Sequence, residues 1–301
     1  MDKETRQARI LVLVVHYRSS DALLGLLNGA RWLDGDEDAK LTIVDNASGH
    51  EELSIIRAAL NEFSNARLLE SPTNRGYFGA ARFAFDHYLE QGKGLPDWVI
   101  VCNHDIEIED KEFFSKLLSQ DPGTVGVIAP RIRVLPGGAD QNPFMRRRPG
   151  ALRWAHLRLV SSNYWAAAIW DWLSRRKSEF RSWVGKRRSA SLNDNAKHES
   201  IYAAHGSFFI FSRRYFEAGG YLDGNLFLYG EEISVAEICR SLGLRVIYEP
   251  SLCVLHREHQ STGRVLSRFT YECQKKALRY ITSRYFSRSQ EFASSCQPDL
   301  P

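Results

Sequence analysis

The chain has 301 residues, a length that allows one large domain or two small ones. A hydrophobic content of 44% and a charged content of 25% are ordinary for a globular protein that buries a core. The net charge of +4 is too small to indicate nucleic-acid binding, so we expect no nucleic-acid partner.

Strands and helices are expected to alternate through the first part of the chain. Residues 10–17 (ILVLVVHY) form a continuous apolar run, which is typical of a fully buried strand. The same reasoning predicts strands at 40–46, 66–71, 97–103 and 125–130, with helices at about 20–28, 50–61, 76–88 and 110–118. This alternation predicts an α/β fold with a doubly wound, mostly parallel sheet.

The composition changes at about residue 144. Residues 145–189 are crowded with Arg and Lys, and Asp171 and Glu179 are the only acids among them. Most of the chain's seven tryptophans are interleaved with these charges: Trp154, Trp165, Trp170, Trp172 and Trp183. Regular structure is expected to resume with a strand at 206–212, a helix at about 231–242 and a strand at 245–250.

The cysteines and the N-terminal residues indicate a cytoplasmic protein. The cysteines are scattered, odd in number and without a C-x-x-C pair: Cys102, Cys239, Cys253, Cys273 and Cys296. The charged start MDKETRQAR predicts no signal peptide, and no apolar run approaches the roughly 18 residues of a membrane span.

Polar side chains follow the predicted strands where each strand ends. They are His16-Tyr17, Asp45-Asn46, Asn74-Arg75 and Asn103–Asp105. Ligands of open α/β sheets bind beyond the carboxyl ends of the strands, so these residues predict a binding site at one edge of the sheet.

The predicted site has no glycine-rich loop for phosphate, because the chain contains neither G-x-G-x-x-G nor G-x-x-x-x-G-K-[ST]. A nucleotide bound there needs another source of positive charge, such as Mg²⁺ or Mn²⁺ held by a carboxylate. Asp105 is the candidate carboxylate, and the alternative is that it only caps the next helix.

Six stretches together resemble a known family. They are LVVHYRS, IVDNASG, NRGYFGAAR, NHDIEI, FLYGEEI and GLRVIYEPSLCVLH. Their order and spacing, from about residue 10 to 263, resemble the inverting family 2 glycosyltransferases of the GT-A fold. The stretches HGSF and LYGEE look most like rhamnosyltransferase-like enzymes of bacterial cell-surface and cell-wall polysaccharide synthesis.

The resemblance implies a nucleotide site. Asp45 would contact the base or ribose, Arg82 would reach phosphate, and Asp105 would ligate a divalent cation, Mg²⁺ or Mn²⁺. Asn103 takes the first place of the family's D-x-D element, where a carboxylate is usual, and Arg82 stands where many relatives have asparagine. The other residues expected to border the nucleotide are His16, Tyr17, Asn74, Arg75, Gly76 and His104.

The resemblance also implies a catalytic base. Glu231 and Glu232 open a predicted helix, where acids also favour the helix dipole without any catalytic role. In the family the second acid of such a pair is the general base, which makes Glu232 the candidate and Glu231 the fallback. His256 is a further candidate ligand for the metal or the diphosphate, whereas H-x-x-H spacing alone is weak support for His259.

These expectations describe a metal-assisted inverting glycosyltransferase acting on a glycan or lipid-linked acceptor. Residues 1–143 would bind the nucleotide sugar, 201–263 would bind the acceptor, and 264–301 would form a helical tail. The basic insert, residues 144–200, would either line the acceptor side as a helical hairpin or bind an anionic membrane surface from the cytoplasm. The rival functions are a sugar nucleotidyltransferase, which would need a glycine-rich loop after the first strand, and a non-catalytic nucleotide- or glycan-binding protein.

Overall fold

The computed structural model describes residues 8–29, 38–135, 139–174, 197–257 and 266–287. The chain divides into two compact units. The first contains Met1–Arg147, Lys197–Phe227 and Glu231–Glu258, and the second contains Arg148–Ala196, Leu228–Gly230 and His259–Pro301.

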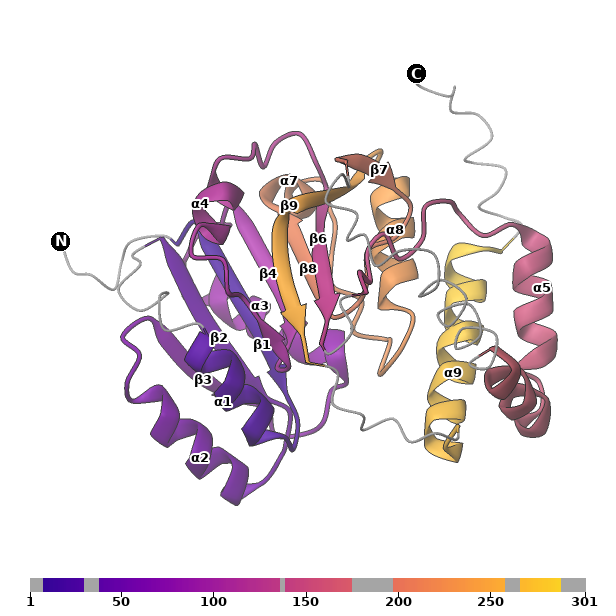
Figure 1. Cartoon of the computed structure of the whole chain (residues 1–301), viewed down its shortest axis with the longest axis horizontal. Helices are drawn as coiled ribbons and strands as arrows, with labels where there is room; N and C mark the ends of the chain where they lie inside the picture. The colour runs from indigo at the N-terminus through magenta and orange to yellow at the C-terminus, as the bar shows by residue number, and fades with distance from the viewer. Residues whose placement is uncertain (1–7, 30–37, 136–138, 175–196, 258–265, 288–301) are drawn as a thin grey trace, which may run out of the picture. The chain divides into compact units, whose positions relative to one another are not determined.

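The first unit is built on a sheet whose N-terminal half is parallel (Figure 1). Its four strands lie in the order β3-β2-β1-β4. They are β1 (Ile10–His16), β2 (Ala39–Asp45), β3 (Ala66–Glu70) and β4 (Trp98–Asn103). All seven residues of β1 are buried, as the unbroken apolar run predicted for a central strand.

The second half of the sheet mixes directions. β8 (Phe208–Ser212) runs antiparallel to both β4 and β6 (Val127–Val134). β6 is parallel to β9 (Val246–His256), and β9 also pairs with the short antiparallel strands β5 (Ile106–Glu107) and β7 (Glu199–Ile201). In the described residues the nine strands form one sheet, and most of them run in one direction, so the predicted α/β class is confirmed.

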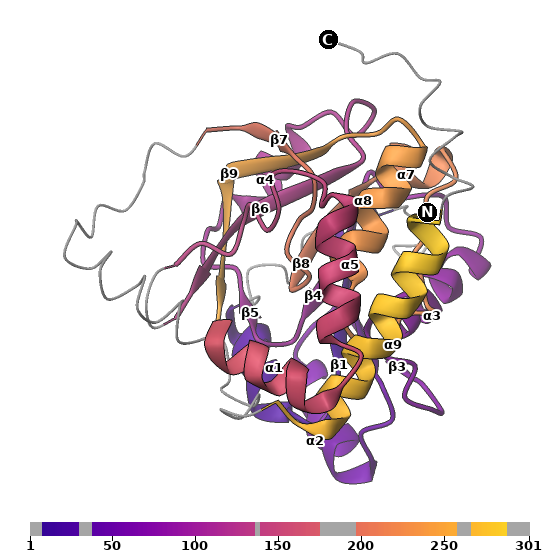
Figure 2. The ribbon, with the colours of Figure 1, turned by 90° about the vertical axis from the view of Figure 1, so that its right-hand side faces the viewer.

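Helices cover both faces of this sheet. α1 (Ser20–Gly29) and α3 (Tyr77–Glu90) lie on opposite faces of the parallel half, as Figures 1 and 2 show. The hydrophobic core includes Leu23, Leu27, Ile56, Leu60, Phe113 and Leu117 packed with β1, β2 and β4. The remaining helices of the unit are α2 (His50–Leu60), α4 (Phe113–Leu118), α7 (Arg213–Glu217) and α8 (Glu231–Ser241).

The second unit joins the start of the basic insert to the C-terminal helix. It contains α5 (Ala151–Val160), a helical segment at residues 164–174, and α9 (Arg268–Tyr285). Trp154 stacks on Phe286 with ring centroids 4.5 Å apart, and the Tyr271 hydroxyl donates to the Ser161 carbonyl at 3.0 Å.

The part of the basic insert from 175 to 196, together with His259 and Cys296, lies outside the described residues. Among the helices that are described, none has the length and apolar character needed to cross a membrane.

Candidate functional site

The ends of the parallel strands bring the predicted polar residues together. His16 is the register partner of Asp45, and Asn103 is the partner of Val15 one residue before His16. Parallel strands in register present their last residues side by side, so one edge of the sheet carries an imidazole, a carboxylate and an amide. This geometry is what the sequence predicted for the strand ends.

Asp45 is a buried carboxylate with capacity left for a ligand. Only 1% of the residue is exposed, and its Oδ2 accepts a hydrogen bond from the Ser48 backbone N–H at 3.0 Å. Its Oδ1 lies 4.0 Å from Nε2 of His16 and has no hydrogen-bond partner among the described residues. A buried acceptor without a donor costs free energy, so this oxygen is suited to a ligand N–H or hydroxyl.

His16 is held as a buried ring beside that carboxylate. Its Nε2 lies 3.2 Å from Oε2 of Glu52, and the ring of His104 meets it edge-on with centroids 5.5 Å apart. Burial lowers the pKa of His16, and charge repulsion from His104 lowers it further against the attraction of Asp45 and Glu52. The ring is therefore neutral at neutral pH. It can line a ligand site as an uncharged surface, but it does not supply positive charge to a phosphate. Its neighbour Tyr17 is 40% exposed.

Asn46 organises the loop after β3, a role that sequence reasoning did not assign to it. Its side-chain N–H groups donate to Asn74 Oδ1 at 3.0 Å and to the Gly76 carbonyl at 3.1 Å. Its Oδ1 accepts from the Arg75 backbone N–H at 2.8 Å. The side chain is 3% exposed, so these bonds are shielded from water and fix the loop against the end of β2. In the sequence, the position of Asn46 directly after Asp45 at the end of a strand was the feature that could have indicated this role.

Gly76 lets this loop approach a distant segment. Its φ is +73°, and a Cβ at this position would overlap the backbone of Phe227. The next residue, Tyr77, donates its backbone N–H to the Phe227 carbonyl at 3.0 Å. Only glycine satisfies both the positive φ and the close approach.

The two predicted arginines have protein partners. The Arg75 Nε donates to Ser71 Oγ at 2.9 Å, and its guanidinium lies 4.5 Å from the Phe83 ring centroid. Arg82 is on the exposed side of α3, where it pairs with Asp86 at 3.4 Å. Arg75 therefore lies in the loop that Asn46 holds. Arg82 lies on α3, where solvent screens its ion pair with Asp86.

Asp105 faces His256 across the turn between β4 and β5. Nε2 of His256 is 3.3 Å from Oδ1 of Asp105, within ion-pair distance, although this oxygen has no well-aligned hydrogen bond among the described residues. Burial alone would raise the pKa of Asp105. Hydrogen bonding and charge attraction from His256, together with charge attraction from His104, outweigh burial and lower that pKa. The carboxylate is therefore ionised at neutral pH.

The other nitrogen of His256 makes the pair a candidate cation site. Nδ1 lies 2.7 Å from the Oε1 of Gln141. Because an amide oxygen only accepts, Nδ1 is protonated and donates a hydrogen bond to it. Nε2 then faces the Asp105 carboxylate, where either a proton on this nitrogen or a bound cation would satisfy the carboxylate oxygen. No group of three or more His, Cys, Asp or Glu side chains gathers as a metal site in the described ranges.

Glu107, two residues beyond Asp105, belongs to a different environment. It lies on β5 and pairs with the Nε of Arg257. Its carboxylate also packs near Gly25 of α1, at 3.6 Å from an ideal Cβ there. The acidic cluster NHDIEI therefore separates into one carboxylate facing the histidine and one that attaches α1 to the sheet.

Glu231 and Glu232 begin α8, as the sequence predicted. Glu231 is 4% exposed, whereas Glu232 is half-buried. The Glu232 carboxylate lies against Gly206, where an ideal Cβ would be 2.7 Å from Oε1. The following residue, Ser207, accepts a hydrogen bond at its carbonyl from the Asn103 backbone N–H at 3.0 Å. Glu232 thus lies near the end of β4, and Asp105 follows that end by two residues.

Tyr77 lies among these acids and was not predicted as a site residue. Its hydroxyl is buried without a hydrogen-bond partner in the described part of the chain. Burial raises the pKa of this hydroxyl, and the negative charges of Glu231, Asp105 and Glu232 raise it further. The hydroxyl therefore remains a hydrogen-bond donor at every physiological pH.

Comparison with known proteins identifies the family. Residues 11–220, more than half of the chain, match the model of the family described as "Glycosyl transferase family 2". The chain belongs to this family. The family resemblance that the sequence motifs predicted is confirmed.

The relatives of this family member include two curated proteins from Mycobacterium tuberculosis strains CDC 1551 / Oshkosh and ATCC 25618 / H37Rv. Both are described as N-acetylglucosaminyl-diphospho-decaprenol L-rhamnosyltransferase. Each is 27% identical to this chain over 215 residues, which cover 69% of this chain and 64% of the relative. The chain therefore spans less than two thirds of the length of these relatives.

Solved structures of glycosyltransferases share the fold. GalNAc-T7, in a complex with UDP, GalNAc and Mn²⁺, superposes with a TM-score of 0.57 at 15% identity, covering 99% of this chain and 53% of that one. Residues 1–349 of Staphylococcus aureus TarS, in a complex with UDP-GlcNAc, superpose with a TM-score of 0.51 at 15% identity, covering 96% and 76%. The GT-A type of sheet is therefore confirmed.

His205 is a second residue near the candidate site that the sequence did not predict. Its Nδ1 accepts the Ser207 backbone N–H at 3.2 Å, so the ring proton lies on Nε2. Its ring centroid is 6.3 Å from that of His256, and its backbone N–H donates to Asn142 Oδ1 at 2.8 Å. Burial, assisted by repulsion from His256, lowers the pKa of His205 to about 4. His205 is the first residue of the stretch HGSF, which in the sequence contributed only to the family resemblance.

The pKa of His205 predicts a loss of stability in mild acid. Between pH 7 and pH 5 this histidine takes up a proton in the unfolded chain and stays neutral in the folded one, so falling pH favours unfolding by about 2 kcal/mol. Urea unfolding at both pH values should show that His205→Gln reduces the acid-induced loss by about this amount. An equal pH dependence in the two proteins would assign the loss to other groups.

Proposed function

We propose that this chain is an inverting glycosyltransferase that transfers a sugar from a nucleotide diphosphate sugar to a lipid-linked glycan acceptor. The observation that supports this most directly is the position of Glu232. Its carboxylate lies against Gly206, near the end of β4, which Asp105 follows by two residues. A candidate base and a candidate diphosphate site thus occur on neighbouring elements of one unit.

Glu232 is assigned the role of general base. It takes the proton of an acceptor hydroxyl as that oxygen attacks the anomeric carbon of the donor, and the nucleotide diphosphate leaves from the opposite face with the bonding electrons. The two new products are a glycoside of inverted configuration and a nucleotide diphosphate. Glu231, more deeply buried at the same helix start, positions the helix or an acceptor hydroxyl.

The nucleotide is assigned to the edge formed by β1, β2 and the Asn74–Gly76 loop. The unsatisfied Oδ1 of Asp45 would accept a hydrogen bond from the base or ribose, with His16, Tyr17 and His104 as the wall. Arg75 would border the nucleotide, and Arg82 would reach phosphate only after leaving Asp86.

A divalent cation fits the facing acceptors of Asp105 and His256. A carboxylate oxygen and an imidazole nitrogen are ligands that Mn²⁺ accepts, and the diphosphate would complete its coordination. When bound, such a cation neutralises charge on the departing diphosphate. Asn103, at the end of β4, would contact the same diphosphate through its amide.

The names of the curated relatives support the choice of substrates. Those proteins are described as transferring L-rhamnose to N-acetylglucosaminyl-diphospho-decaprenol, a sugar attached to a lipid diphosphate. We therefore assign to this chain a deoxyhexose donor such as a nucleotide diphosphate rhamnose, and a role in bacterial surface or cell-wall polysaccharide synthesis.

A thermal-shift screen of nucleotide sugars with Mg²⁺ and Mn²⁺ tests this assignment. A ligand present at 100 times its Kd stabilises the folded state by about 2.7 kcal/mol, which raises Tm by several degrees. We expect nucleotide diphosphate rhamnose to give the largest shift, and Asp45→Asn to reduce it. If no nucleotide sugar shifts Tm by more than free nucleoside does, the donor assignment is wrong.

The second unit carries an apolar stripe that suits a membrane surface. Trp165, Ile169 and Trp172 are 67%, 59% and 55% exposed, and their spacing of four and three residues places them on one face of the helical segment. Arg153 and Arg158 are exposed on α5 nearby in the sequence. Indole rings bind at the depth of lipid headgroups, where arginine meets anionic lipid, so this stripe is proposed to hold the protein at its lipid-linked acceptor.

Vesicle sedimentation tests the stripe. Binding to anionic vesicles should weaken as salt rises, because the charge attraction is screened. Replacing Trp165 and Trp172 by alanine should lower the binding constant at least about tenfold, since each buried aromatic contributes roughly 1.5–3 kcal/mol. Trp170, whose ring packs on His156, provides the control as Trp170→Phe. Failure of the unmutated protein to sediment at low salt would make the stripe an acceptor or oligomer surface.

A further inference from the structure

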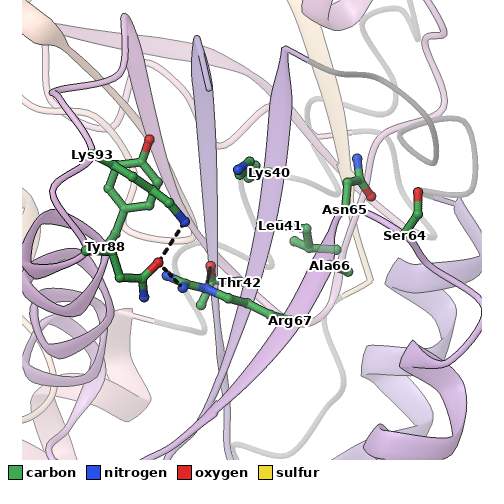
Figure 3. A pocket seen from close by; sticks show the side chains of 10 residues that line it. Lys40, Leu41, Thr42, Ser64, Asn65, Ala66, Arg67, Tyr88 and Lys93 are labelled. Carbon is green, nitrogen blue, oxygen red and sulfur yellow. Dashed lines mark hydrogen bonds between the residues drawn. The ribbon is translucent and has the colours of Figure 1, made fainter. Parts of the chain in front are cut away.

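A separate cavity opens on the first unit at the opposite ends of strands β2 and β3 (Figure 3). Its volume is about 460 Å³. Lys40 and Ala66 mark the beginnings of the two strands, whereas Asp45 and Glu70 mark the ends where the nucleotide edge lies. Strand residues rise about 3.3 Å each, so Thr42, the lining residue of β2 nearest to Asp45 in sequence, is about 10 Å from it along the strand.

The lining of the cavity is basic. Lys40, Arg67 and Lys93 contribute positive charge, and no acid is among the described residues that line it. Its other lining residues are Leu41, Thr42, Ser64, Asn65, Ala66, Tyr88 and Gln91. A concave surface with charge of one sign concentrates ions of the opposite sign.

Arg67 is incompletely satisfied by the protein. Its Nε donates to Thr42 Oγ1 at 3.0 Å and its Nη1 donates to Gln91 Oε1 at 3.0 Å. Its Nη2 is buried and has no hydrogen-bond partner within the described residues. Burial lowers the pKa of Arg67, because the cation is partly withdrawn from water. An arginine withdrawn from water is normally paired with an anion.

Lys93 brings a second positive charge to the same point. Its Nζ donates to Gln91 Oε1 at 2.7 Å, the same oxygen that accepts from Arg67, and Figure 3 shows the two side chains reaching toward each other. The Lys93 ammonium also lies 5.4 Å from the Tyr88 ring centroid. The two cationic side chains thus converge on one neutral acceptor, and an anion bound there would reduce the repulsion between them.

We propose that this cavity is a binding site for a phosphate-bearing small molecule, with the free Nη2 of Arg67 and the ammonium of Lys93 donating to phosphate oxygens and Lys40 adding charge. Guanidinium and ammonium groups are the usual protein partners of phosphate. A volume of about 460 Å³ exceeds what one phosphate fills, so the ligand class is a phosphorylated sugar or another phosphate ester of similar size. The site stands independently of the proposed transfer reaction.

Isothermal calorimetry with inorganic phosphate and with glucose 6-phosphate tests the proposal. The unmutated protein should bind both, and glucose 6-phosphate more tightly. Arg67→Gln and Lys93→Gln should each weaken binding at least tenfold, and Arg67→Lys should give an intermediate loss because it keeps charge without the second donor arm. Lys111→Gln, an exposed lysine outside the cavity, is the matched control and should bind like the unmutated protein.

Two further measurements separate the sources of phosphate and the two sites. Sedimentation with phosphatidic acid vesicles is measured on protein carrying Trp165→Ala and Trp172→Ala, so that the stripe does not contribute. Binding that is lost when Arg67→Gln is added would assign the phosphate to a lipid headgroup if free phosphates do not bind. Nucleotide diphosphate binding should be unchanged in Arg67→Gln and weakened in Asp105→Asn, so failure of one site leaves the other testable. The proposal is overturned if neither source binds at millimolar concentration, or if folded Arg67→Gln, checked by circular dichroism, binds phosphate as the unmutated protein does.

Discussion

Replacing Glu232 by glutamine is expected to lower kcat by about 10²–10⁴-fold, the usual cost of losing a general base. Glutamine keeps the size of the side chain and its contact with Gly206 but removes its proton affinity. A sugar hydroxyl is too weak an acid to attack unaided at neutral pH, so the loss should appear in kcat. Donor affinity, measured by calorimetry, should remain nearly unchanged because the substitution is made on the acceptor side.

Glu231→Gln is the matched control for this prediction. Successive helical side chains point about 100° apart, so only one of two adjacent acids faces the substrate squarely. Glu231 is buried at 4% exposure, and its substitution should cost stability more than rate. A slower enzyme from Glu231→Gln than from Glu232→Gln would move the base by one residue, and full activity in both would refute the base assignment.

Asp105→Asn is expected to remove the Mn²⁺-dependent part of nucleotide diphosphate binding. Truncating one charged partner of a buried site costs about 2 kcal/mol or more, at least tenfold in affinity. The asparagine preserves the shape of the turn and leaves an acceptor oxygen toward His256, but it lacks the negative charge that attracts a cation. Calorimetry with and without Mn²⁺, on both proteins, measures the difference.

Glu107→Gln provides the control for Asp105, since this acid lies two residues away and pairs with Arg257. It should retain the Mn²⁺ dependence and lose some stability through the detached arginine. Equal affinity of the unmutated protein for the nucleotide with and without Mn²⁺ would contradict the metal assignment, whatever the variants do.

The strands of the parallel half could be predicted from the sequence because their signal is local. Continuous apolar runs such as residues 10–17 identify a strand buried on both faces, and the polar residues after them identify its end. The antiparallel insertion of β8 between β4 and β6 could not be predicted, since the partner of a strand depends on contacts far apart in the chain. β5 and β7 are only two and three residues long and leave no periodic pattern.

The sequence predicted where three candidate acids lie on the secondary structure. Asp45 ends β2, Asp105 lies in the turn directly after β4, and Glu232 is in the first turn of α8. The sequence could not separate Asp105 from Glu107, because their different surroundings come from His256 and Arg257, about 150 residues later in the chain.

The supporting residues were harder to predict than the acids. Asn46 acts through three hydrogen bonds to a loop about 30 residues away, which composition and spacing do not reveal. Tyr77 resembles an ordinary aromatic residue of an amphipathic helix until the structure shows its hydroxyl buried near the acids. Burial and long-range pairing decide both roles, and neither is a property of a short stretch of sequence.

The most direct test of the account is release of nucleotide diphosphate from a nucleotide sugar in the absence of acceptor, followed by proton NMR. We expect slow donor hydrolysis with Mn²⁺ present, in which the first sugar product has the anomeric configuration opposite to that of the donor. Glu232→Gln should hydrolyse the donor more slowly and still bind it. Binding of the donor without any turnover, even when lipid-linked acceptor is added, would contradict the account and identify a nucleotide-sugar-binding protein instead.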